Sequence, residues 1–88
     1  MRIKKGFVLN EVAGNNIVVG VGKNSSDLGG MLTLNSSGVF IWNLLKKNRT
    51  YDEVVDALLE KYDTTKEEAE KGLDIFIKSA RELGVLDE

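Results

Sequence analysis

The chain has 88 residues, of which 42% are apolar and 30% are charged, and it contains neither cysteine nor histidine. A chain of this length and composition folds around one small core, so we expect a single domain over residues 1–88. Without cysteine or histidine there is no disulfide, thiolate nucleophile, iron–sulfur site or imidazole metal ligand. We therefore expect a protein that is not an enzyme and that holds no cofactor and no metal.

The charges are distributed unevenly along the chain. Residues 1–35 carry four basic and two acidic side chains, whereas residues 36–88 carry eight basic and twelve acidic ones. A nucleic-acid-binding protein needs a concentrated basic surface. No stretch approaches the roughly 18 apolar residues of a membrane span, and the N-terminus lacks the apolar run of a signal peptide. We expect a cytoplasmic protein that binds neither nucleic acid nor membrane.

The first part of the chain reads as three short strands. Residues 6–12 form the first, and Gly14-Asn15-Asn16 is a turn signal because glycine and asparagine tolerate positive φ. Residues 17–21 return as the second strand, with Ile17, Val19 and Val21 on one face. A polar, glycine-rich loop over residues 23–30 leads to a third strand at 31–34, where Leu32 and Leu34 share a face.

Three helices are predicted to follow. The first begins near Ser36 or Ser37, either of which can cap it, and stops near Asn48. The second opens with a capping box formed by Thr50 and Glu53. Its apolar residues recur at helical spacing and form one buried face: Tyr51, Val54, Val55, Leu58, Leu59 and Tyr62.

The third helix has two overlapping capping boxes, one from Thr64 and one from Thr65, and ends at Gly84. Val85 and Leu86 are expected to return to the core. The predicted core stripe of this helix consists of Ala69, Leu73, Phe76, Ile77, Ala80 and Leu83. Other residues expected in the core are Ile41, Trp42, Leu44 and Leu58.

This order predicts a small winged-helix-like α+β domain, with a three-stranded antiparallel sheet followed by three helices. A single three-stranded sheet leaves exposed edges that can pair with another chain. A winged helix that binds DNA is one alternative, but the second helix is acidic and the third carries four basic and five acidic residues between 66 and 82. A module that self-associates through its strand edge is another.

Ile75 does not fit the core stripe of the third helix. At 100° per residue it lies roughly 120° from the centre of the stripe, so it is predicted to be at least partly exposed. The small residues Gly72 and Ser79 lie between it and the core. Two interpretations remain open. Either Gly72 lets the sheet pack closely while Ile75 rests under the N-terminal arm, or these three residues floor a shallow groove with Lys71, Lys78 and Arg81 at its rim.

Residues 34–45 carry the pattern L-N-x-x-G-x-x-I-W-x-L-L, which resembles the signature of the PqqD-like family, named for a pyrroloquinoline quinone biosynthesis protein. The T-x-x-E-V-V opening at Thr50, the Tyr62-Asp63 pair and the closing Leu83-Gly84-Val85-Leu86 are also similar, so the resemblance covers nearly the whole chain. One departure is Gly72, where the family usually places an aspartate.

The resemblance implies a non-catalytic peptide-binding protein. Family members bind the leader segment of a ribosomally made precursor peptide and present it to a modifying enzyme, often a radical-SAM enzyme. The leader adds as a strand beside the third strand of the sheet and lies against the third helix. Quinone synthesis itself is not implied, and a homodimer is compatible with the pattern.

The resemblance and the periodicity together give a set of expected contacts with the peptide. Backbone groups of residues 31–34 are expected to pair with it, Ile75, Phe76 and Ser79 to meet its apolar side chains, and the basic rim to meet its acidic ones. The full expected set is Met31, Leu32, Thr33, Leu34, Lys71, Gly72, Ile75, Phe76, Lys78, Ser79 and Arg81.

Overall fold

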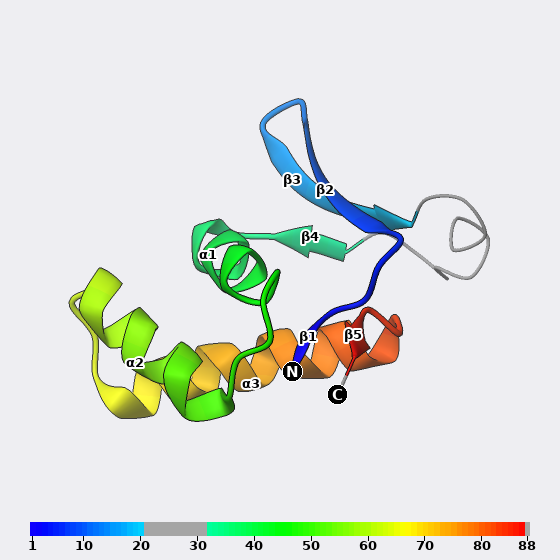
Figure 1. Cartoon of the computed structure of the whole chain (residues 1–88). Coiled ribbons are helices and arrows are strands. Elements are labelled where there is room, and N and C mark those ends of the chain that lie inside the picture. Colours follow the sequence, from blue (N-terminus) through cyan, green and yellow to red (C-terminus); the bar gives the residue numbers. More distant parts are fainter. Residues whose placement is uncertain (21–31, 88) are drawn as a thin grey trace.

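The computed structural model describes residues 1–20 and 32–87, and the expected α+β order is confirmed (Figure 1). An antiparallel sheet comes first, and its strands lie in the order β2-β3-β4. They are β2 (Phe7–Val12), β3 (Asn15–Gly20) and β4 (Leu32–Leu34). Three helices follow: α1 (Ser36–Leu44), α2 (Tyr51–Lys61) and α3 (Lys66–Glu82).

A second, two-stranded sheet was not expected from the sequence. It pairs β1 (Arg2–Ile3) with β5 (Leu86–Asp87) and so joins the two ends of the described chain. The Arg2 side chain also donates a hydrogen bond to the Asp87 carboxylate at 3.0 Å. Both side chains are about half exposed, so this ion pair adds little stability beyond the backbone pairing.

The turn between β2 and β3 consists of Ala13 and Gly14. The predicted turn at Gly14-Asn15-Asn16 is wrong by one residue, because Asn15 and Asn16 already belong to β3 and pair with Val12 and Glu11. Ala13 has φ 52° and Gly14 has φ 81°. Positive φ at both central residues is the backbone of a tight hairpin turn whose twist matches the flanking strands.

The inner face of the sheet is carried by Val18, which pairs with Leu32 and is fully buried. Residues directly opposite each other in an antiparallel pair lie on the same face, so Leu32 and Leu34 do share this face as predicted. Ile17 and Val19 lie on the other face and are only half-buried. Val21, the predicted loop at 23–30 and Met31 lie outside the described residues.

Asn35 caps α1, where Ser36 or Ser37 had been predicted. Its side-chain oxygen accepts a hydrogen bond from the Gly38 backbone N–H at 2.8 Å and another from the Ser37 hydroxyl at 3.0 Å. Asparagine is as good a cap as serine, and here its position directly after β4 decides the choice. The helix ends with Leu45 as its C-cap, before the predicted stop at Asn48.

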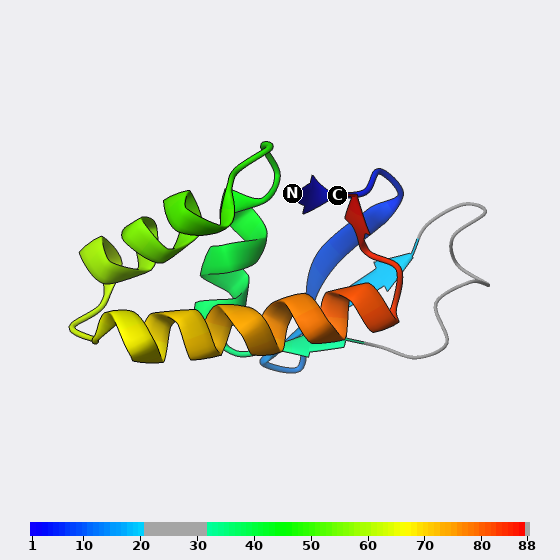
Figure 2. The ribbon, with the colours of Figure 1, turned by 90° about the horizontal axis from the view of Figure 1, so that it is seen from below.

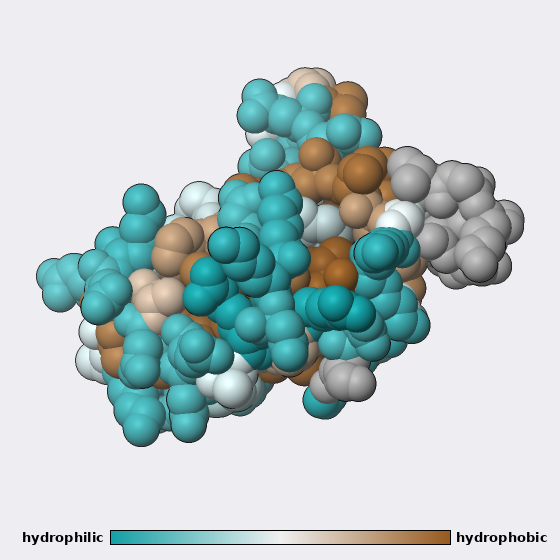
Figure 3. Space-filling view, viewed as in Figure 1, coloured by the Kyte–Doolittle hydropathy of each residue, from teal (hydrophilic) through white to brown (hydrophobic). Residues whose placement is uncertain are grey.

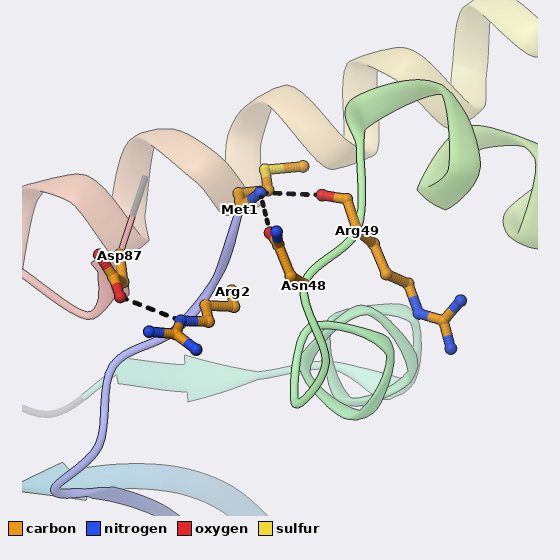
Figure 4. A network of polar contacts seen from close by, with 5 residues as sticks. All are labelled: Met1, Arg2, Asn48, Arg49 and Asp87. Carbon is orange, nitrogen blue, oxygen red and sulfur yellow. Dashed lines mark hydrogen bonds and ion pairs between the residues drawn. The ribbon is translucent and has the colours of Figure 1, made fainter.

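Asn48 instead helps to hold the N-terminal strand against the loop between α1 and α2 (Figure 4). The Met1 nitrogen donates to the Asn48 side-chain oxygen and to the Arg49 carbonyl, both at 2.9 Å. The Arg49 N–H donates back to the Met1 carbonyl at 3.0 Å. Carbonyl groups at the end of α1 that lack helical partners are bonded nearby: the Ile3 N–H donates to the Leu45 carbonyl at 2.8 Å, and the Arg49 side chain donates to the Leu44 carbonyl at 3.0 Å.

The predicted caps of the other two helices are largely confirmed. Thr50 and Glu53 form the complete capping box of α2. Thr65 caps α3, while the Thr64 hydroxyl donates to the Glu68 carboxylate instead of capping the helix. Gly84 follows the last turn with φ 70°, a conformation that favours glycine.

All three helices and the inner face of the sheet contribute to one core. Ile41, Trp42, Leu58 and Leu73 are buried as predicted, and so are Val85 and Leu86. Leu44 and Leu83 are only half-buried, and Leu45 occupies the core position expected for Leu44. Viewed from below, α3 runs past α2, α1 and β4 in turn (Figure 2). Within the described residues, no helix has the length and apolar character needed to cross a membrane.

Candidate functional site

One edge of the three-stranded sheet is open beside α3. β4 pairs with β3 on one side, where Ile17 lies opposite Thr33, and the described residues place no strand on its other side. An unpaired edge presents backbone N–H and C=O groups that can bond to another extended chain. β4 runs along α3 in both ribbon views (Figures 1 and 2), so this edge and the helix face the same space.

A groove of about 180 Å³ lies between β4 and α3. We call it the β4–α3 groove. It is lined by Leu32, Thr33, Leu34, Asn35, Ser37, Gly38, Ile41, Gly72, Ile75, Phe76 and Ser79. None of these side chains is charged, so the groove suits uncharged side chains and backbone groups, with a few hydroxyl and amide partners at the α1 end.

Ile75 is the most exposed large apolar residue of α3, at 61%, whereas Leu73, two positions earlier, is fully buried. Phe76 lines the groove from the core side and is 5% exposed. The helix therefore turns one apolar residue outward at the groove while its neighbours hold the core. Exposure of a large isoleucine beside an open strand edge is typical of a binding surface.

The structure decides between the two interpretations of Gly72. A Cβ placed on Gly72 would meet no atom within 4 Å, so close packing does not require glycine there. Ile75 is not covered by the N-terminal arm either. The interpretation that placed both residues in close packing is wrong. Gly72 and Ser79 line the groove on either side of Ile75, as the other interpretation predicted.

Seven of the residues singled out from the sequence come together in the β4–α3 groove: Leu32, Thr33, Leu34, Gly72, Ile75, Phe76 and Ser79. Met31 lies outside the described residues. Lys71, Lys78 and Arg81 are not among the lining residues of the groove. They line two adjoining hollows on the other side of Ile75, where they alternate with carboxylates such as Asp74 and Glu82.

The end of the groove formed by α1 was not predicted from the sequence. Asn35, Ser37, Gly38 and Ile41 line it there. A Cβ on Gly38 would lie 3.2 Å from the Leu34 side chain, so glycine allows the helix to start close against the strand. These residues follow β4 directly in the sequence, and this proximity was the signal that could have identified them.

Tyr51 connects α2 to α3 next to the exposed isoleucine. Its hydroxyl donates a hydrogen bond to the Asp74 carboxylate at 2.8 Å, which is the main cause that raises the pKa of Tyr51 to about 12. Within residues 1–20 and 32–87, no group of three carboxylates is arranged to hold a metal ion. The Tyr51–Asp74 bond holds α2 against α3.

The fold and the groove together define a small α+β domain that leaves one strand edge open beside a helix. The sequence matches the family described as coenzyme PQQ synthesis protein D over residues 6–86. The chain therefore belongs to the PqqD family. Among curated proteins, none matches the sequence.

Solved structures with a similar fold include two complexes. One is described as TbiB1 in complex with the TbiA(beta) leader peptide, with a TM-score of 0.69 and 24% identity over 99% of this chain and 100% of that chain. The other is lasso peptide synthetase B1 complexed with the leader peptide, with a TM-score of 0.71 and 18% identity over 96% of this chain and 93% of that chain. At these identities the likeness establishes the fold.

Proposed function

We propose that this chain is a non-catalytic peptide-binding protein that holds the leader segment of a ribosomally made precursor peptide. The observation that carries the proposal is the open edge of β4 facing a groove in which Ile75 is exposed. Membership of the PqqD family supports it, and so does the fold shared with two proteins whose structures contain leader peptides.

The leader adds to the sheet as a fourth strand beside β4. Its backbone bonds to the N–H and C=O groups of β4 that point away from β3, which belong to alternate residues of the strand. This pairing supplies affinity with little dependence on sequence. Because β4 has three residues, the paired stretch is about 10 Å long. The rest of the leader must therefore gain its affinity from side chains.

Side chains of the leader supply the specificity. Every second residue of an added strand points toward α3, where it meets Ile75, Phe76 and the gap over Gly72. An apolar side chain that covers Ile75 removes exposed hydrophobic surface from water, at about 25 cal/mol per Å². Lys71, Lys78 and Arg81 lie beyond Ile75 and attract acidic residues of the leader that extend past the groove.

In this proposal the bound leader is presented to a peptide-modifying enzyme of the radical-SAM type, in the cytoplasm, by a domain that spans residues 1–88. The domain itself carries out no chemistry. It raises the local concentration of the precursor at the enzyme by tethering.

The substitution Ile75→Glu tests the groove. The first step is to search the neighbouring genes for a short precursor peptide; its leader is then synthesised, and its affinity for the protein is measured by calorimetry. We expect the variant to lose binding while its melting temperature stays within about 2 °C of the parent, because Ile75 is exposed. Lys66→Glu, on the exposed first turn of α3, is the matched control and should bind normally. Equal affinity of Ile75→Glu and the parent would remove Ile75 from the site.

Sedimentation at micromolar concentration tests whether a second copy occupies the same edge. A monomer that binds leader supports an open β4 edge. The alternative result is a stable dimer that binds leader only after dilution has dissociated it. That result would assign the β4 edge to self-association.

A further inference from the structure

A second hollow lies at the other edge of the sheet, between the edge strand β2 and helix α1. We call it the β2–α1 hollow. Its volume is about 590 Å³, and it is lined by Ile3, Lys4, Phe7, Val8, Leu9, Trp42, Asn43 and Lys46. It shares no lining residue with the β4–α3 groove, so both can be occupied at the same time.

The floor of this hollow is apolar, whereas its rim is polar and includes Lys4, Asn43 and Lys46. Trp42 closes it from α1 and is 2% exposed, Phe7 and Leu9 are half-buried, and Val8 is 40% exposed at the rim. Figure 3 shows apolar surface on this face of the molecule, between the β2–β3 hairpin and the helical part. Exposed apolar surface next to a large aromatic residue is typical of a contact with another protein.

The charged residues of the hollow are all basic. Lys4 stands at the β1 end and Lys46 at the α1 end, both exposed, and no carboxylate is among the lining residues. The hollows beside α3 differ, since their lysines alternate with Glu67, Glu70 and Asp74. The β2–α1 hollow is therefore complementary to an acidic ligand, although the helical part of the chain is acidic overall.

The backbone at this hollow is open as well. β2 pairs with β3 on one side, and the described residues place no strand against its other edge. Phe7, Val8 and Leu9 are the residues of β2 that line the hollow, and they give about 10 Å of this edge, with the exposed Glu11 two residues beyond them. An extended segment pairs with about three residues of this part of the edge.

We infer that the β2–α1 hollow binds an extended acidic segment of a partner protein, with one bulky apolar side chain of that segment seated over Trp42. The acidic residues on either side of this anchor pair with Lys4 and Lys46. The inference rests on the proposed function only in naming the source of the segment, which is the enzyme that receives the leader. The two surfaces then hold the leader and the enzyme on opposite edges of one sheet.

Trp42 is the only tryptophan of the chain, so its fluorescence reports on this hollow directly. The probe is a seven-residue synthetic peptide, acetylated and amidated, with a central Leu-Phe pair flanked by glutamates. We expect a saturable change in Trp42 emission. The double variant Lys4→Glu/Lys46→Glu should bind the probe at least about tenfold more weakly, because two attractive pairs become repulsive. The single variant Lys66→Glu should bind it as the parent does.

A second probe with glutamine in place of each glutamate needs no protein variant. We expect it to bind at least about tenfold more weakly than the acidic probe. Equal binding of the two probes, equal binding by the double variant, or no saturable change with the acidic probe would each overturn the inference.

The variant Ile75→Glu separates this inference from the proposed function. It should bind the acidic probe normally even though it loses the leader. Loss of the acidic probe in Ile75→Glu would place that probe in the β4–α3 groove and contradict the second site. Retention of the leader by Ile75→Glu would remove Ile75 from the leader site and leave the test of the hollow intact.

Discussion

The hydroxyl of Tyr51 donates a hydrogen bond to the carboxylate of Asp74 at 2.8 Å, one residue before the exposed Ile75. This bond joins the first residue of α2 to the middle of α3. The helix that carries the groove is therefore held through the hollow on the other side of Ile75, where Lys71 and Lys78 also lie.

The Tyr51–Asp74 bond predicts an unusual phenol titration. The bond is the largest cause that raises the pKa of Tyr51 from 10.0 to about 12. Between pH 10 and 12, folded Tyr51 keeps its proton whereas an unfolded tyrosine loses it. The contribution of the bond to the stability of the fold is therefore complete below pH 10 and is lost as the pH rises through 12. Near-ultraviolet titration in a Tyr62→Phe background should give a midpoint near 12. Asp74→Asn should move it toward 10, and an unchanged midpoint would show that the bond does not form in solution.

Leu73 and Ile75 should separate stability from binding. Leu73 is fully buried, so Leu73→Ala should lower the free energy of unfolding by about 2–5 kcal/mol. Ile75 is 61% exposed, so Ile75→Ala should change the free energy of unfolding by less than about 0.5 kcal/mol. Urea unfolding followed by circular dichroism measures both. Similar losses for the two variants would mean that Ile75 is packed in solution and not available to a ligand.

Replacing Gly72 should stabilise the domain. A Cβ there meets no atom within 4 Å, and alanine is favoured over glycine inside a helix by about 0.5–1 kcal/mol. Gly72→Ala should therefore raise the free energy of unfolding by that amount. Gly84→Ala is the matched control and should lower the free energy of unfolding, because φ at Gly84 is 70°.

Gly72→Leu should keep the fold but fill the groove and weaken leader binding. Unimpaired binding by Gly72→Leu would exclude this part of the groove from the contact.

The capping box of α2 should depend on pH. The Thr50 N–H donates to the Glu53 carboxylate at 2.8 Å, and this bond lowers the pKa of Glu53 from its ordinary 4.5. Its contribution to stability is present above about pH 4.5 and is lost as the pH falls below it. Thr50→Ala should cost about 1 kcal/mol at pH 7. Thr64→Ala should cost less, since Thr65 caps α3. Equal costs would show that the Thr50 cap does not stabilise α2.

The sequence predicted best those elements that are stabilised by local interactions. The stripe of α2 and the caps at Thr50 and Thr65 involve residues three or four positions apart, and the structure confirms them. The cap of α1 was misassigned because Asn35, Ser36 and Ser37 are all good caps. Only the end of β4 at Leu34 selects the asparagine.

Long-range features escaped the prediction for a physical reason. β1 and β5 have two residues each and pair across nearly the whole chain, so neither carries a periodic pattern. The exposure of Ile75 followed from helical geometry alone. The contribution of α1 to the groove did not, because it depends on how closely Gly38 approaches Leu34.

Amide hydrogen exchange with and without the leader peptide tests the central claim most directly. Leader binding is predicted to slow exchange of the β4 amides that point away from β3 and to leave β2 unchanged, because an added strand takes up the open edge of β4. Saturating leader that leaves β4 exchange unaltered, or that protects β2 instead, would contradict the account.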